Sequence, residues 1–139
     1  MPAMKIFTDG GSRGNPGPAA FALLIYDSRG KLLESHSEFI GPATNNVAEY
    51  RGVLKALKLA RKHGKGEVVC TMDSELAVMQ LSGKYKIKKV HLKELHALVR
   101  EEERHFKKVT YTHVKREDKH ISCVDSMLND ILDKIEAKQ

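Results

Sequence analysis

Two acidic residues fall on the apolar faces of two predicted helices, and this restricts the fold more than any other feature of the chain. Glu49 shares a helical face with Val53, Ala56 and Ala60, at spacings of i, i+4, i+7 and i+11. Asp125 starts a similar apolar stripe in the last predicted helix. Burying a carboxylate on a packing face is costly unless a positive charge meets it. We therefore expect the fold to bring something cationic to both positions.

Two further acids end short apolar segments that have the character of strands. Asp9 ends MKIFTD and Asp73 ends EVVCTMD. Each acid has an ordinary structural explanation: Asp9 would suit a turn before two glycines, Asp73 could cap the next helix, and Glu49 and Asp125 could interact with helix dipoles. One shared site explains two strand-end acids and two helix-face acids better than four separate roles do. Four converging carboxylates would form an oxygen-rich site for Mg2+ or Mn2+.

The order of the predicted elements favours an α/β fold. Three strands, MKIFTD, AFALLIYD and KLLESHSEFI, are separated by GGSRGNPGP and DSRG and predict an antiparallel meander. A helix over residues 46 to about 63 follows, with Thr44 or Asn45 as its N-cap. The later elements are the strand EVVCTMD, the helices SELAVMQL and HLKELHALVREEERHF, the strand KVTYTHV, and a helix over residues 122 to about 137. Strands that alternate with helices after a meander predict a mixed sheet covered by helices.

The length and composition predict a small globular protein. With 139 residues, the chain fits a single domain over residues 1–139. No apolar run approaches the roughly 20 residues of a membrane span, and the N-terminus lacks a signal-peptide pattern. We therefore expect a cytoplasmic monomer with no membrane contact, in which Cys70 and Cys123 are free thiols. Lysine and arginine number 24 against 18 acidic residues, a net charge of +6 that favours polyanionic partners.

Four sequence blocks resemble those of type-one ribonuclease H in order and spacing. The blocks are TDGGSRGNPGPAAFALLIYD, TNNVAEYRGVLKAL, MDSELAVMQLSGKYKIK and VDSMLND, and the resemblance covers about residues 5 to 133. It implies the RNase H-like fold, a five-stranded mixed β-sheet flanked by α-helices. It also implies a site that binds two Mg2+ or Mn2+ ions. By motif position, the expected metal ligands and catalytic residues are Asp9, Glu49, Asp73 and Asp125.

The resemblance further implies the reaction. The family cuts the RNA strand of RNA–DNA hybrids endonucleolytically and leaves 5′-phosphate and 3′-hydroxyl ends. Two divalent ions can activate a water and stabilise the departing oxygen. Asp9 is expected to bridge both ions, with Glu49 and Asp73 near the attacking water or the scissile ribose and Asp125 on the other flank. Activity on duplex RNA stays open, and the alternatives are a non-catalytic hybrid-binding module and another nuclease of the same fold.

Polar residues around the acids are the expected contacts of the hybrid. Gly10 and Gly11 would let the RNA approach the backbone closely. Matching positions in the family contact both strands, although turn and cap roles would also explain these residue types. By this transfer the substrate-binding residues are Gly10, Gly11, Ser12, Asn15, Thr44, Asn45, Asn46 and Ser74. Discrimination for RNA would depend on contacts to the 2′-hydroxyl.

A lysine-rich segment, GKYKIKKVHLK, is the expected contact for the DNA backbone. Some family members carry a longer basic protrusion here, for which this chain has no room. Hybrid binding should therefore be weaker, or should depend more on Lys86, Lys88 and Lys89. The alternative is that these lysines are merely solvated.

The segment before the last acid, HVKREDKHISCVD, also departs from the family. Many relatives have a loop histidine there that assists product or proton transfer. The aligned position holds Glu117, and His120 follows three residues later. Either residue could assist catalysis, while His120 could equally be a surface residue. Because the loop is longer than in close relatives, Asn129 is a minor alternative to Asp125 near the metals.

Overall fold

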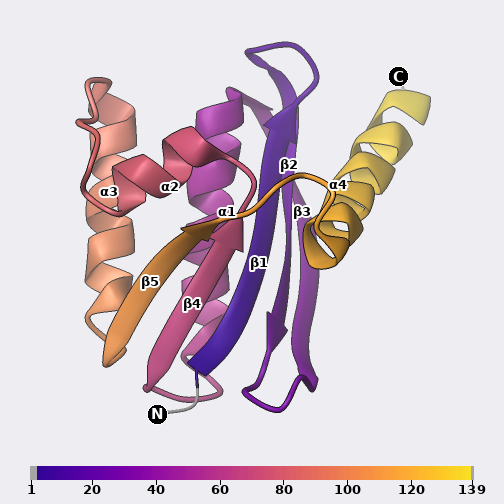
Figure 1. Cartoon of the computed structure of the whole chain (residues 1–139). Coiled ribbons are helices and arrows are strands. Elements are labelled where there is room, and N and C mark those ends of the chain that lie inside the picture. Colours follow the sequence, from indigo (N-terminus) through magenta and orange to yellow (C-terminus); the bar gives the residue numbers. More distant parts are fainter. Residues whose placement is uncertain (1–2, 139) are drawn as a thin grey trace.

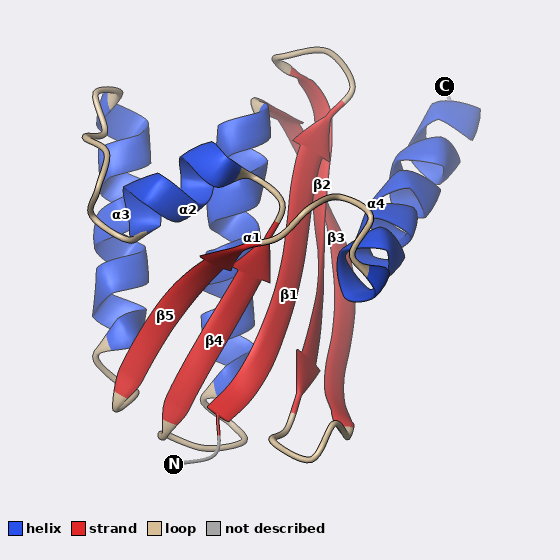
Figure 2. Ribbon diagram, in the orientation of Figure 1, coloured by secondary structure: helices blue, strands red, loops and turns tan. Residues whose placement is uncertain are grey.

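A five-stranded sheet with helices on both faces makes up the computed structural model, which describes residues 3–138 (Figure 1). The strands lie in the order β3-β2-β1-β4-β5. β2 is antiparallel to β1 and β3, whereas β4 is parallel to β1 and β5, so the predicted mixed sheet is confirmed (Figure 2). The elements are β1 (Ala3–Ser12), β2 (Gly17–Tyr26), β3 (Leu32–Ala43), α1 (Asn45–Ala60), β4 (Glu67–Met72), α2 (Glu75–Leu81), α3 (Val90–Glu103), β5 (Lys108–His113) and α4 (Lys119–Ala137).

Successive side chains of the central strands pack alternately into two separate hydrophobic cores, one on each face of the sheet. On one face, Ile6 and Phe21 pack with α1, α2 and α3 in the larger core. On the other face, Phe7 and Ala22 pack against the apolar stripe of α4. Successive side chains of a strand point to opposite faces, so Asp9 lies on the same face of β1 as Phe7. The helices that carry Glu49 and Asp125 therefore cover opposite faces of the sheet.

The glycine-rich segment after Asp9 is strand for longer than predicted. β1 continues to Ser12, and Gly10 and Gly11 pair with Phe21 and Ala20 of β2. The prediction that these residues form a loop is wrong. Glycine inside a strand often marks the close approach of another backbone, and α1 makes such an approach here.

Two helices begin earlier than predicted. α1 starts at Asn45, one residue before the predicted start, and Thr44, one of its two predicted N-caps, caps it; its first turn contains no acidic residue, so Glu49 lies deeper in the helix than expected. α4 starts at Lys119, three residues before the predicted start at residue 122. The cause is Asp118, whose carboxylate accepts hydrogen bonds from the backbone N–H groups at the start of the helix.

The remaining predictions for individual residues have mixed outcomes. Ser74, and not Asp73, caps α2 by accepting a hydrogen bond from the Ala77 N–H. Cys70 and Cys123 are free thiols, as predicted. Among the helices described here, none combines the length and apolar character needed to cross a membrane.

Candidate active site

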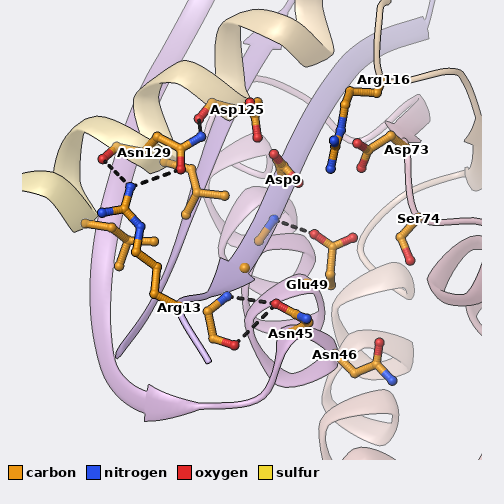
Figure 3. Close-up of a pocket in the computed structure, with 15 residues that line it drawn as sticks. Asp9, Arg13, Asn45, Asn46, Glu49, Asp73, Ser74, Arg116, Asp125 and Asn129 are labelled. Carbon is orange, nitrogen blue, oxygen red and sulfur yellow. Dashed lines mark hydrogen bonds between the residues drawn. The ribbon is translucent and has the colours of Figure 1, made fainter. Parts of the chain in front are cut away.

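Three carboxylates meet at one end of the sheet. Asp9 lies near the end of β1, Asp73 follows β4 directly, and Glu49 projects from α1 (Figure 3). β1 and β4 are parallel, with Phe7 opposite Thr71, so each strand places an aspartate two residues further on at the same edge. Each of the three acids offers a carboxylate oxygen, and these oxygens all lie within 4.8 Å of one another. The sheet register and the α1 packing together produce this cluster.

Glu49 is buried, and only one of its oxygens is satisfied. The Gly10 N–H donates a hydrogen bond to Glu49 Oε1. Glu49 Oε2 is also buried but has no hydrogen-bond partner. An unpartnered buried carboxylate oxygen is unfavourable in the protein alone. It is the kind of atom that a bound cation would satisfy.

Gly10 allows α1 to approach β1 closely enough for this contact. A Cβ atom at Gly10 would lie 2.5 Å from the Ala48 carbonyl carbon and 2.6 Å from the Glu49 nitrogen, both backbone atoms of a packed helix. The contact therefore excludes any side chain at this position.

Replacing Gly10 with alanine should accordingly destabilise the protein and displace Glu49. We expect Gly10→Ala to lower the free energy of unfolding by about 1–3 kcal/mol, the usual cost of overpacking. Denaturant unfolding would measure this decrease. Gly11→Ala is the matched control, because its Cβ would meet nothing closer than a side-chain atom of Leu128 at 3.5 Å. Equal stabilities of the two variants would contradict the close-approach argument.

Asp125 reaches the cluster from α4, on the opposite face of the sheet. Its side chain lies beside Asp9 (Figure 3) and contributes to the raised pKa of that acid, and it lines the same cleft. Asn129 is turned to other partners: its side-chain amide donates to the Asp125 carbonyl oxygen at 3.0 Å, and its Oδ1 accepts from Arg13 at 3.2 Å. Asp125, and not Asn129, is thus the α4 residue whose side chain lies beside Asp9 (Figure 3).

Burial and mutual repulsion disfavour full ionisation of the cluster. Burial raises the pKa of Asp9, and the charges of Glu49 and Asp73 raise it further. Burial is also the largest cause of the raised pKa of Glu49. Burial raises the pKa of Asp73 too, although the nearby Arg116 guanidinium opposes this. A divalent cation would relieve both the repulsion and the desolvation, and an all-carboxylate donor set suits Mg2+ or Mn2+.

The cleft around the acids has a volume of about 300 Å³ and contains most of the predicted substrate-binding residues. Those lining it are Gly10, Gly11, Ser12, Asn45, Asn46 and Ser74. Asn15 and Thr44 do not line the cleft but support it. The Asn15 side-chain oxygen accepts from the Asn45 N–H at 3.0 Å, and Thr44 caps α1.

The predicted auxiliary residues lie outside this cleft. Glu117 is exposed in the turn before α4 and does not line it. His120 lies in the first turn of α4, where its ring packs on Phe7 and Tyr26 at centroid distances of 4.4 and 4.9 Å. Neither residue lines the cleft, and the packed ring of His120 agrees with the alternative that it has no part in catalysis. The predicted DNA-binding lysines lie between α2 and α3, also outside the cleft (Figure 1).

Two arginines also line the cleft, and neither was predicted from the sequence as a site residue. Arg116 lies in the connection between β5 and α4 and faces Asp73 (Figure 3). Arg13 follows β1 and forms part of the wall toward α4. The only signal in the sequence was their position, Arg116 beside the aligned Glu117 and Arg13 inside the glycine-rich block.

Comparisons with known proteins place the chain in a family. A family model described as reverse transcriptase-like matches residues 7–126, a range that contains all four acids. The bifunctional protein Rv2228c of Mycobacterium tuberculosis is 39% identical over 129 residues, which are 92% of this chain and 35% of that protein. The chain thus spans about a third of the length of this curated relative.

Proteins named as ribonucleases H match in sequence and in structure. Ribonuclease HI of Halobacterium salinarum is 34% identical over 127 residues, covering 91% of this chain and 63% of that protein. The crystal structure of RNase H1 from this archaeon matches with a TM-score of 0.88 at 32% identity, covering 95% of this chain and 98% of that one. LC11-RNase H1 in complex with an RNA/DNA hybrid matches with a TM-score of 0.88 at 38% identity and the same coverages. On its sequence, its sheet topology and its acidic cleft, the chain belongs to the ribonuclease H family.

Proposed function

We propose that this protein is a ribonuclease H that hydrolyses the RNA strand of RNA–DNA hybrids internally, leaving 5′-phosphate and 3′-hydroxyl ends. The observation that supports this most directly is the convergence of Asp9, Glu49 and Asp73 in an open cleft, with Asp125 beside Asp9. The hybrid bound to a structural relative supports the same substrate class. The net charge of +6 is consistent with a polyanionic substrate.

The four acids would hold two divalent ions, Mg2+ or Mn2+. Asp9 would be the central ligand of this set, because its carboxylate lies close to those of Glu49 and Asp73 and beside Asp125. Such ions supply Lewis-acid activation of a water and stabilise charge on the departing oxygen. The unsatisfied Glu49 Oε2 is a further ligand atom available for this purpose.

The chain itself would position the hybrid through Asn45 and the glycines of β1. The Ser12 N–H donates to Asn45 Oδ1 at 2.8 Å, which fixes the orientation of the amide and leaves its NH2 group to donate to substrate. Gly10 and Gly11 keep the floor of the cleft free of side chains. We propose that Asn45, Asn46 and Ser74 contact the hybrid here, including its 2′-hydroxyl groups.

Arg116 would attract the scissile phosphate toward the acids. Its guanidinium is the positive group that opposes the raised pKa of Asp73. A cation on the wall of an acidic cleft partly offsets the repulsion between the carboxylates and the phosphate backbone. We therefore assign Arg116 to substrate phosphate binding.

Cleavage of matched substrates tests the proposed activity. An RNA–DNA hybrid, duplex RNA and duplex DNA of one sequence would be incubated with Mg2+ or Mn2+, and with a chelator. We expect metal-dependent cutting of the RNA strand of the hybrid, with products that carry 5′-phosphate. Equal cutting of duplex DNA would refute the hybrid assignment, and hybrid binding without cutting would favour the non-catalytic alternative.

The lysines between α2 and α3 are a separate proposal, because they lie outside the cleft. If Lys86, Lys88 and Lys89 bind phosphates, replacing all three with glutamine should flatten the slope of log K against log salt. Each phosphate that is no longer neutralised should reduce this slope by up to about 0.9, the value for a B-form duplex. Hybrid binding titrations between low and moderate salt would measure the slope. An unchanged slope would mean that these lysines are only solvated.

A further inference from the structure

Arg13 links the β1–β2 connection to α4 through several contacts. One terminal guanidinium nitrogen lies 2.7 Å from Asp133 Oδ1 and the other lies 2.9 Å from Glu136 Oε1. The first of these nitrogens also donates to Asn129 Oδ1 at 3.2 Å (Figure 3). Both terminal nitrogens of the planar Arg13 guanidinium thus bond to side chains of α4. This geometry fixes the orientation of the helix relative to Arg13 as well as the distance between them.

Asn129 extends this link to an acid of the cluster. While its Oδ1 accepts from Arg13, its Nδ2 donates to the Asp125 carbonyl oxygen at 3.0 Å. The contacts therefore run from the guanidinium through Asn129 to the backbone of Asp125. Since the Asp125 side chain lies beside Asp9 in the same cleft (Figure 3), a shift of α4 along its axis would move this carboxylate relative to the cluster.

The same connection is bonded to α1 on its other side. The Ser12 N–H donates to Asn45 Oδ1, and the Asn45 N–H donates to Asn15 Oδ1. The segment from Ser12 to Asn15 thus contacts the helix that carries Glu49 and the helix that carries Asp125. These helices cover opposite faces of the sheet and belong to different apolar cores. The hydrophobic effect is non-directional, so the directional polar contacts of this segment add a constraint on the register of α4 to the one that its apolar packing supplies.

We propose that Arg13 is a positioning residue that sets the register of α4 and thereby holds the Asp125 carboxylate at the acidic cluster. This role rests on the proposed nuclease function of the cleft. A direct phosphate contact is the competing role for an arginine here. It is disfavoured because Asp133 and Glu136 already pair with the guanidinium and offset its charge.

Removing either side of the contact distinguishes the two roles. Arg13→Met removes the guanidinium group. Asp133→Asn combined with Glu136→Gln keeps Arg13 but removes the two carboxylates that pair with it. If Arg13 positions α4, both changes should lower kcat for the hybrid by roughly 10-fold, because small misplacements of reacting groups are costly. KM should change less than about 2-fold under this positioning role. Arg13→Lys, which keeps the charge without the guanidinium group, should be intermediate.

A second readout does not depend on turnover. Mn2+ binding to each free variant, measured by calorimetry, should weaken in parallel with kcat, because Asp125 would no longer be held beside Asp9. Arg29→Met is the matched control, since Arg29 is exposed in the turn at the opposite end of β2. This control should retain both the wild-type kcat and the wild-type Mn2+ affinity.

Two results would overturn the positioning role. A lower KM and a steeper salt dependence in the Asp133→Asn, Glu136→Gln variant would mean that freed Arg13 binds phosphate. Values of kcat and Mn2+ affinity that match Arg29→Met in all the Arg13 and acid variants would mean that the ion pairs have no role at the site. If the wild-type protein bound Mn2+ without cutting any hybrid, the proposed function would fail, while the Mn2+ affinities would still decide the role of Arg13.

Discussion

Asp9→Asn should abolish metal-dependent cleavage of the hybrid while leaving hybrid binding detectable. Asp9 is the acid on which the charges of Glu49, Asp73 and Asp125 converge. Asparagine keeps the shape of the side chain but removes the negative charge that the proposed metal ligand supplies. We expect kcat to fall by roughly 10³-fold or more, as for other central catalytic groups. Cleavage assays with Mg2+ and with Mn2+, alongside binding titrations in a chelator, would measure both effects.

A neutral replacement elsewhere separates this effect from a general change of charge. Asp130→Asn removes one acid from the exposed surface of α4 and should leave cleavage unchanged. Undiminished cleavage by Asp9→Asn would contradict the assignment of Asp9 as a catalytic residue. Loss of hybrid binding together with loss of the folded circular dichroism spectrum would mean that the variant tests folding instead of catalysis.

The acid cluster was predictable because regular elements position its members. Asp9 and Asp73 each end an apolar strand pattern, and parallel pairing of those strands brings the ends together. The helical period placed Glu49 on the buried side of α1, where the structure has it. The periodicity of apolar residues thus determines which side each acid faces.

The supporting contacts were not predictable from the same patterns. Arg13 and Arg116 lie in connections, where no periodicity shows which way a side chain points. Their partners depend on how α4 crosses the sheet, which is a tertiary property. The position of His120 depends on a local feature, since the Asp118 cap starts α4 at Lys119 and places His120 in its first turn, against Phe7 and Tyr26. The need for glycine at position 10 becomes visible only with α1 in place.

Glu49→Gln should make the cation-free protein more stable at alkaline pH and should also inactivate it. Burial raises the pKa of Glu49 in the folded state, so the folded protein holds this proton more tightly than the unfolded chain does. The contribution of this proton to the free energy of unfolding is fully present below about pH 4, the range in which carboxyl groups of the unfolded chain titrate. It is lost as the pH rises toward the raised pKa of Glu49 in the folded protein. Glutamine is neutral throughout and can still accept the Gly10 hydrogen bond through its oxygen.

The difference in melting temperature between the variant and the wild-type protein should therefore grow as the pH rises, with the variant the more stable. Without divalent cations, their melting temperatures should be similar near pH 4, and at pH 8 the variant should melt roughly 3–8 °C higher, corresponding to about 1–2 kcal/mol. Added Mn2+ should stabilise the wild-type protein by mass action and the variant much less. Cleavage by the variant should fall by about 10²-fold or more.

Glu94→Gln provides the matched control, because Glu94 is exposed on α3 and far from the cleft in sequence and structure. It should follow the wild-type melting curve at every pH and keep its response to Mn2+. A cation-free Glu49→Gln protein that melts below the wild type at pH 8 would mean that the Glu49 carboxylate is already stabilised without a metal. In that case the repulsion within the cluster would have to be relieved by groups of the chain itself, and Arg116, which opposes the raised pKa of Asp73, is a candidate.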